Sequence, residues 1–164
     1  MRYLIFLSIF LSSLAYATPD QLVLDAGLGV FNSKGSSLSQ NKFAKIGYQE
    51  DIWYNLKQRF NIGAWLDTRG PGYSNSAFGG YQLGFEVENS IFDSSIFAGP
   101  SLITTPDQQL GGILQFNESI YFGIKDDNYD TIGIALNHFS SAGLEMPNQG
   151  ENFLCVEIKM PFEF

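Results

Sequence analysis

The chain has 164 residues, with 9 lysines and arginines against 17 aspartates and glutamates, and a formal net charge of −8 at pH 7. This balance excludes the basic surface that nucleic-acid binding needs, so we expect no nucleic-acid partner. Aromatic residues make up 15% of the chain and charged residues only 16%, which is few charges for a soluble domain. The single cysteine, Cys155, excludes an intramolecular disulfide, so stability must come from packing or from closure of a sheet.

The first residues have the plan of a secretory signal peptide. Met1 and Arg2 give a short positive start, residues 3–14 are an apolar run interrupted only by serines, and residues 15–17 (Ala-Tyr-Ala) form a small-x-small cleavage site. The run is too short to cross a membrane as a helix, and no later segment is long enough either. We therefore expect residues 1–17 to be a signal peptide and residues 18–164 to be one exported domain. An N-terminal membrane anchor is the alternative.

Apolar and polar residues alternate with a period of two over most of the remaining chain, which is typical of β-strands with two different faces. Polar segments, several of them rich in Gly, Pro and Ser, separate the alternating stretches. We expect eight strands, at residues 21–31, 41–54, 59–67, 77–87, 91–103, 110–125, 130–140 and 151–164.

Two of these strands contain residues that disturb the pattern. Pro100 predicts a bulge in the fifth strand, because proline cannot donate to the ladder. Glu118 falls on the apolar face of the sixth strand and predicts a bulge or a break, and a split near Asn117 would give nine strands. Eight are favoured because the connectors are then long after the first, third, fifth and seventh strands and short after the second, fourth and sixth.

An even strand number, short periplasmic turns and long external loops are typical of bacterial outer-membrane barrels. The predicted fold class is therefore all-β, an eight-stranded antiparallel transmembrane β-barrel in the outer membrane of a Gram-negative bacterium. Side chains fill a barrel of this size, which makes a porin-like channel unexpected. The charges that alternation places inside are expected to form a structural polar network: Asp25, Arg59, Asp67, Glu86, Lys125, Glu157 and Lys159.

Residues 137–152 hold the only histidine of the chain. Alternation puts His138 and Ser140 on the apolar, lipid-facing side of the seventh strand, with their Cα atoms about 7 Å apart. An imidazole at this spacing can reach a serine hydroxyl, which is the base–nucleophile arrangement of acyl hydrolysis. On the last strand, alternation places Asn152, and not Glu151, on the same outer surface.

This segment resembles the lipid A 3-O-deacylase family (PagL type). That family has a His-x-Ser-Asn-x-Gly core, a Pro-Asn-x-Gly turn and a Glu shortly before the last strand; residues 138–143 here read His-Phe-Ser-Ser-Ala-Gly and residues 147–150 read Pro-Asn-Gln-Gly. Residues 114–116 (Leu-Gln-Phe) are also similar to the family. The resemblance implies an outer-membrane serine esterase that removes an ester-linked acyl chain from lipid A or lipopolysaccharide. It implies roles for four residues: His138 as base, Ser140 as nucleophile, and Asn148 with a backbone N–H near Gly143 as oxyanion hole.

Two positions depart from the family motif. Ser141 replaces an asparagine, and the position of the family's glutamate falls on Asn152. An amide can hold the histidine ring but stabilises an imidazolium less well than a carboxylate does. Three alternatives stay open: Asn152 orients the ring, a one-residue bulge swings Glu151 outward as the acid, or the enzyme is weakened. Glu145 on the preceding loop is a more remote substitute.

One histidine and one cysteine cannot make a zinc site of the usual kinds, and no glycine-rich phosphate loop lies between a strand and a helix. We therefore expect neither a metal nor a cofactor, and the expected partners are the lipid A substrate and the lipids of the outer membrane. A non-enzymatic small barrel, acting as an adhesin, a lipid-binding protein or a structural protein, is the alternative function. A soluble exported barrel with an internal ligand is a third.

Overall fold

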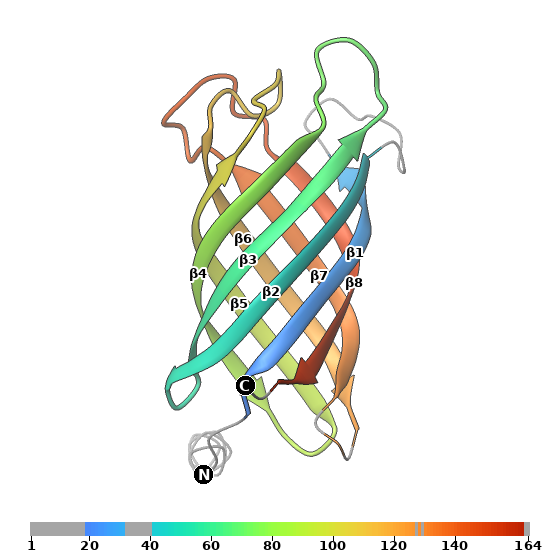
Figure 1. Cartoon of the computed structure of the whole chain (residues 1–164), viewed down its shortest axis with the longest axis vertical. Helices are drawn as coiled ribbons and strands as arrows, with labels where there is room; N and C mark the ends of the chain where they lie inside the picture. The colour runs from blue at the N-terminus through green and yellow to red at the C-terminus, as the bar shows by residue number, and fades with distance from the viewer. Residues whose placement is uncertain (1–18, 32–40, 127, 129, 163–164) are drawn as a thin grey trace, which may run out of the picture.

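The computed structural model describes residues 19–31, 41–126, 128 and 130–162, and in it the strands form one closed antiparallel barrel in sequential order (Figure 1). The strands are β1 (Gln21–Phe31), β2 (Asn41–Trp53), β3 (Leu56–Asp67), β4 (Ser76–Glu88), β5 (Phe92–Ile103), β6 (Leu114–Lys125), β7 (Thr131–Ser140) and β8 (Glu151–Pro161). The predicted fold class is confirmed, and the alternative of nine strands is wrong because β6 runs through Asn117 without a break. The described residues contain no helix with the length and hydropathy needed to cross a membrane.

The starts of two strands, β3 and β6, differ from the prediction by more than one residue, and β8 ends at Pro161 instead of residue 164. β3 begins at Leu56, which pairs with Trp53, so that Tyr54 and Asn55 form a tight turn; Lys57 forms an ion pair with Asp51 across it. β6 begins at Leu114 instead of residue 110. Residues 110–113 belong to the preceding connector, from which Leu110 makes an isolated bridge to Asn148.

Both predicted bulges are wrong. On either side of Pro100 the strands β4 and β5 keep one register, with Gly80 opposite Ser101 and Leu83 opposite Ala98. β6 and β7 pair without interruption past Glu118, so this carboxylate faces outward from a regular strand. A register shift does occur between Gly29 and Phe31 of β1, where β1 pairs with the start of β8.

The two ends of the barrel differ in their connectors. Long connectors after β3, β5 and β7 gather at the top of Figure 1, and we call this the loop end; the short turns lie at the opposite, turn end. The predicted loop at residues 32–40, the predicted signal peptide at residues 1–17 and residues 163–164 lie outside the described residues. The long connectors that are described hold the C-terminal ends of β3, β5 and β7 near one another.

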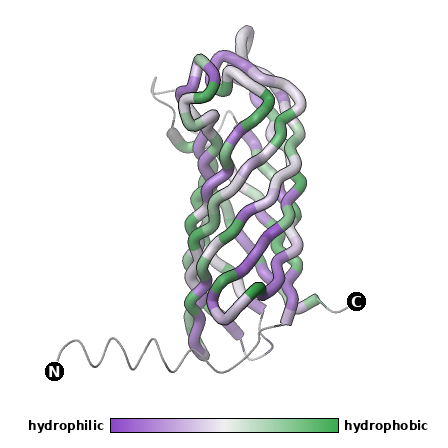
Figure 2. Tube along the Cα trace, turned by 90° about the vertical axis from the view of Figure 1, so that its left-hand side faces the viewer, coloured by the Kyte–Doolittle hydropathy of each residue, from purple (hydrophilic) through white to green (hydrophobic). Residues whose placement is uncertain are grey.

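The outer wall is apolar and the interior is not. Along each strand buried and exposed residues alternate, and Figure 2 shows the matching alternation of hydropathy along the tube. The exposed large side chains of the wall include Leu28, Ile62, Phe85, Ile120, Ile134 and Val156. A soluble protein rarely exposes so continuous an apolar surface, and such a surface marks contact with a membrane or with another protein.

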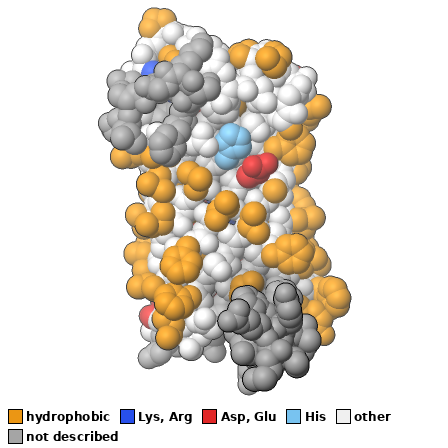
Figure 3. Space-filling model, turned by 180° about the vertical axis from the view of Figure 1, so that it is seen from behind, with side chains coloured by type: hydrophobic (Ala, Val, Ile, Leu, Met, Phe, Trp, Pro, Cys, Tyr) orange, Lys and Arg blue, Asp and Glu red, His pale blue; other side chains and the backbone are white. Residues whose placement is uncertain are grey.

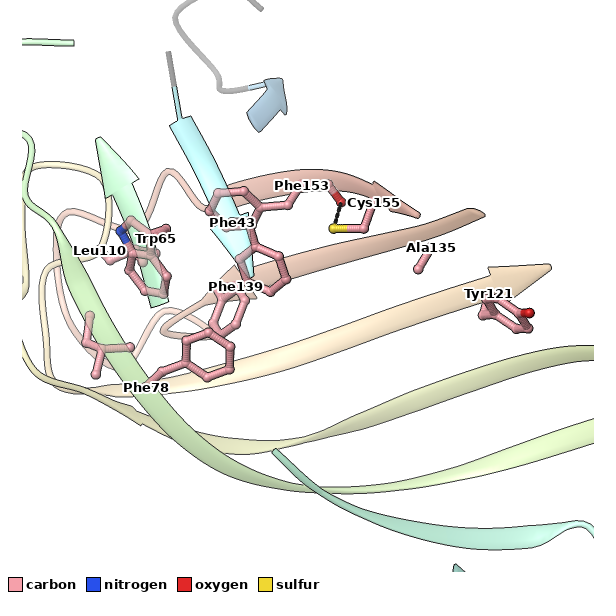
Figure 4. Packing of buried hydrophobic residues seen from close by; sticks show 10 residues of the cluster. Phe43, Trp65, Phe78, Leu110, Tyr121, Ala135, Phe139, Phe153 and Cys155 are labelled. Carbon is pink, nitrogen blue, oxygen red and sulfur yellow. Dashed lines mark hydrogen bonds between the residues drawn. The ribbon is translucent and has the colours of Figure 1, made fainter. Parts of the chain in front are cut away.

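Aromatic side chains fill the interior toward the loop end. Phe43, Trp65, Phe78, Phe139 and Phe153 point toward one another in Figure 4, and each is at most 5% exposed. The ring centroids lie 4.6 Å apart for Phe43 and Phe153 and 4.8 Å apart for Phe78 and Phe139. This aromatic cluster anchors β7 and β8 from inside, next to the residues predicted to carry the chemistry.

Ion pairs fill the rest of the interior. The fully buried Arg59 lies 3.2 Å from Glu157, Lys45 lies 2.6 Å from Asp25, and Lys159 bonds to both Glu86 and Asp93. These inward charges form the expected polar network, except that Asp67 belongs to a separate group at the loop end and Lys125 pairs with Glu88 at the turn end. The interior ion pairs also include Lys45, Lys57 and Asp93, which the sequence analysis does not single out.

Removing one member of a buried ion pair should cost more than removing both, because the remaining charge is left without compensation. We expect Arg59→Met to lower the free energy of unfolding by about 3–5 kcal/mol. We expect the double variant Arg59→Met with Glu157→Leu to be less destabilised than this single variant. Urea unfolding followed by tryptophan fluorescence in detergent micelles measures both; a double variant as unstable as the single one, or less stable, would contradict the interpretation.

Candidate active site

A row of polar side chains crosses the outer wall near the loop end. In the β6–β7 pairing Glu118 lies opposite His138, and in the β7–β8 pairing His138 lies opposite Asn152. All three face outward, and in Figure 3 the histidine stands beside an acidic side chain on an otherwise largely apolar wall. Directly below, an apolar row follows the same strands, with Ile120 opposite Leu136 and Leu136 opposite Leu154.

The ring of His138 is held by Asn152. Its Nδ1 lies 2.9 Å from Oδ1 of Asn152, which is an ordinary hydrogen bond. Because an amide oxygen only accepts, Nδ1 carries the proton in this arrangement and Nε2 is left as the acceptor. The ring therefore has the tautomer that a general base needs at Nε2.

Ser140 lies two residues beyond His138, at the end of β7, and is half-buried on the same outward face. Its partner on β6 is Phe116, which is also half-buried. Phe139, between the two polar residues, points into the barrel and is fully buried in the aromatic cluster. That anchor holds His138 and Ser140 to the outer surface.

Glu151 lies on the opposite face of β8 from Asn152. It is 2% exposed, forms an ion pair with Arg69, and accepts a hydrogen bond of 3.1 Å from Nδ2 of Asn41. No register shift separates Phe139 from Glu151 in the β7–β8 pairing, so no bulge turns this carboxylate toward His138. The amide of Asn152, and not the carboxylate of Glu151, therefore contacts the ring.

Inside the barrel at the loop end, Arg69 lies among acidic side chains. Its guanidinium bonds to Asp67 and Glu151, and Asp107 brings a carboxylate oxygen within 4.8 Å of oxygens of both acids. Burial lowers the pKa of Arg69, but hydrogen bonds with Asp67 and Glu151 outweigh this, and the net pKa lies above the ordinary value. The three carboxylates offer oxygen ligands for a cation, although Arg69 already supplies positive charge among them.

Gly150 makes room for the histidine ring. A Cβ at this position would lie 2.6 Å from Cε1 of His138, and the backbone has φ +74°, which L side chains rarely adopt. Any other residue would therefore both strain the turn and push the ring. The sequence analysis does not predict this role, because it identifies Gly150 only as the last residue of a turn.

The loop between β7 and β8 is fastened by its own polar side chains. Oδ1 of Asn148 accepts a bond of 2.8 Å from the backbone N–H of Ser141, and the Ser141 hydroxyl donates to the carbonyl of Glu145 at 2.8 Å. This leaves the Nδ2 group of Asn148 as the donor of that side chain. Gly143 has φ +80° and has open space around it.

The same loop is tied to the connector between β5 and β6. The backbone N–H of Gly111 donates to Pro147 at 2.7 Å, and that of Gln149 donates to Gln109 at 2.9 Å. Leu110, between these two contacts, is buried in the aromatic cluster. The predicted oxyanion-hole residue Asn148 is thus held on two sides. Glu145, the remote substitute acid, extends toward the same connector, where its carboxylate lies against Gly112.

Comparisons with known proteins identify the family of the chain and its structural relatives. The model of the family described as "Lipid A 3-O-deacylase (PagL)" matches residues 38–161. The lipid A deacylase PagL of Pseudomonas aeruginosa is 38% identical over 55 residues, which cover 34% of this chain and only 32% of that protein.

Two solved structures share the fold. The crystal structure of the outer membrane enzyme PagL has a TM-score of 0.61 and 21% identity, covering 85% of this chain and 99% of that one. The crystal structure of Neisserial surface protein A has a TM-score of 0.64 and 14% identity, covering 90% and 99%. At these identities both establish the barrel fold alone. The family model, however, spans most of the sequence, and on that match the chain belongs to the lipid A 3-O-deacylase (PagL) family.

Proposed function

We propose that this chain is an outer-membrane serine esterase that removes the acyl chain ester-linked at the 3-position of lipid A. One observation carries the proposal: His138, on the apolar outer wall, has its Nδ1 bonded to Asn152 at 2.9 Å, which leaves Nε2 as the base, and Ser140 lies two residues along the same face. The family and the Pseudomonas relative supply the substrate class.

The membrane location rests on the wall of the barrel. Strands of 10 to 13 residues are long enough for a hydrocarbon core, which tilted strands of about 9–11 residues can cross. The loop end would face the outside, and the predicted signal peptide at residues 1–17 would direct export. The polar row of Glu118, His138 and Asn152 would then lie at the level where ester groups meet acyl chains.

The apolar residues around this row fit an acyl chain. Leu136 and Leu154 lie side by side just below His138 and Asn152, and Leu144 on the loop is 64% exposed. A lipid A molecule held against the wall keeps its chain in the bilayer and brings only the ester to the polar row. The substrate need not leave the membrane, and the barrel interior takes no part.

In the first half of the reaction, Nε2 of His138 removes the proton of Ser140 while Oγ attacks the acyl carbonyl carbon. The tetrahedral intermediate collapses, the bond to the sugar oxygen breaks, and His138 returns the proton to that oxygen. In the second half, a water deprotonated by His138 attacks the acyl carbonyl carbon, the bond to Oγ of Ser140 breaks to release the fatty acid, and His138 returns the proton to Oγ. Asn152 holds the ring throughout, so that Nε2 faces the reacting groups.

Negative charge develops on the carbonyl oxygen in both halves. The Nδ2 group of Asn148 and the backbone N–H of Gly143 are the donors assigned to it. Because Oδ1 of Asn148 already accepts from Ser141, the side chain is pre-oriented and loses little freedom when the oxyanion forms. Removing one such donor typically costs about 10²–10³ in kcat.

Ser140→Ala removes the nucleophile and should abolish acyl loss. Mass spectrometry of lipid A from cells that express the parent chain should show loss of one ester-linked acyl chain, and cells that express the variant should show none. A non-enzymatic barrel predicts intact lipid A in both strains. Equal acyl loss with both chains would also contradict the assignment.

Asn152→Glu supplies a carboxylate where the ring now contacts an amide. We expect kcat to rise by about tenfold, because a carboxylate stabilises the imidazolium as well as orienting the ring. Asn152→Leu, which can do neither, should lose activity. Initial rates of fatty-acid release in mixed micelles of lipid A and detergent measure both variants; unchanged rates in both would show that Asn152 does not act on His138.

Gly150→Ala places a methyl group against the ring of His138 and should lower the rate of acyl release at least about tenfold while the barrel still folds. Gly70→Ala is the matched control, because Gly70 also has positive φ but nothing lies within 4 Å of its Cβ position. The resistance of the folded barrel to SDS at room temperature reports folding. Equal rates for the two variants would refute the role given to Gly150.

A further inference from the structure

Glu118 is a carboxylate in an unusual place. Among the described strand residues, the charged side chains that face outward are Lys42, Glu50 and Glu118, with His138 as the neighbouring titratable group. Lys42 is the second residue of β2, at the loop end, and Glu50 lies toward the turn end, where it accepts hydrogen bonds from Gln58 and Tyr48. Glu118 instead lies within β6, with apolar residues above and below it on the wall.

A charged side chain on the membrane face of a barrel is destabilising, so its presence needs a reason. Glu118 is not displaced by a bulge, because its register with both neighbours is regular: Ala98 on β5 and His138 on β7. Directly opposed residues of antiparallel strands have Cβ atoms about 4.5–5.5 Å apart. The carboxylate therefore flanks the imidazole from β6 while Asn152 bonds to it from β8.

We propose that Glu118 supplies the negative charge that stabilises the His138 imidazolium during acyl transfer, in place of the carboxylate that Asn152 lacks. The inference rests on the proposed function and deepens it. Glu118 acts through His138 and is a positioning residue, not a catalytic one. The two tasks of a triad acid are then divided: Asn152 orients the ring by a hydrogen bond, and Glu118 provides the charge.

The charges around the ring support this division. From β8 the ring meets the neutral Asn152, since Glu151 points inward to Arg69. From the loop the charged group is Glu145, whose carboxylate lies against Gly112 of the neighbouring connector. From β6 it is Glu118. A negative charge close to a ring that becomes positive in the transition state stabilises that state, and Glu118 is the carboxylate that the strand register brings beside His138.

Steady-state kinetics on the purified full chain test the proposal. The substrate is lipid A in detergent micelles, and the fatty acid released is measured by mass spectrometry. We expect Glu118→Gln to lower kcat by roughly ten- to hundredfold with little change in KM, because the lost charge acts on the transition state. Glu118→Asp should regain part of the loss. Glu50→Gln, which removes the other outward carboxylate, should leave both constants unchanged.

A double variant tests whether Glu118 does the work of the missing acid. In the background Asn152→Glu, the loss caused by Glu118→Gln should be much smaller, because the ring then has a second carboxylate. An equal loss in both backgrounds would show that Glu118 acts on something other than the imidazolium, such as folding or lipid contact, and would overturn the proposal.

The outcomes distinguish failure of the proposed function from failure of the role inferred for Glu118. If the parent chain releases no fatty acid, the proposed function fails and the role inferred for Glu118 falls with it. If the parent is active, Ser140→Ala is inactive and Glu118→Gln keeps the parent kcat, the proposed function stands and this inference alone is refuted.

Discussion

Strict alternation of side chains in a closed sheet is the constraint on which this structure depends. Every residue of β7 and β8 faces either the packed interior or the outer wall, and a shift of one residue would exchange the two sets. Phe139 and Phe153 are fully buried in the aromatic cluster, so His138, Ser140 and Asn152 must lie outside. The ion pair of Glu151 with Arg69 strengthens the same register from within. The burial of Phe139 and Phe153 therefore fixes His138, Ser140 and Asn152 on the outer wall.

The same alternation places the carboxylate of Glu151 and the amide that orients the ring of His138 on opposite faces of the barrel wall. The carboxylate at the start of β8 is held inside the barrel, and the ring on the outer wall contacts an amide. A hydrogen bond from the ring to an amide oxygen fixes the tautomer of the imidazole but adds no charge. The only carboxylate that alternation brings to the same wall from the described neighbouring strands belongs to Glu118 on β6. The family motif and this chain thus differ at the residue that contacts the histidine ring, which is Asn152 here.

Much of this follows from the sequence because alternation is a local property. It predicts the strands closely, places Ser140 beside His138, and selects Asn152 over Glu151. What it cannot supply is the register between strands. The pairing of Glu118 with His138 depends on how β6 meets β7, and a carboxylate on an apolar face predicts a bulge that the structure does not contain. Alternation also predicts strand at residues 110–113, although tertiary contacts hold Leu110 in a connector.

The sequence alone does not predict the role of Gly150, for a related reason. It depends on the ring of a residue twelve positions earlier, which the hairpin brings back against the turn. Arg69 belongs to a loop whose Gly and Pro residues predict only irregular backbone, and its ion-pair partners Asp67 and Glu151 lie on β3 and β8. Sequence patterns describe each strand well and describe contacts between segments poorly.

The central claim is that Ser140 is a nucleophile activated by His138, and covalent labelling tests it most directly. A fluorophosphonate reacts with a serine only when a base activates it. The purified chain in detergent should be labelled at Ser140, as mapped by peptide mass spectrometry, and His138→Ala should abolish the label. Release of fatty acid from lipid A by a chain that takes up no label at Ser140 would contradict the account.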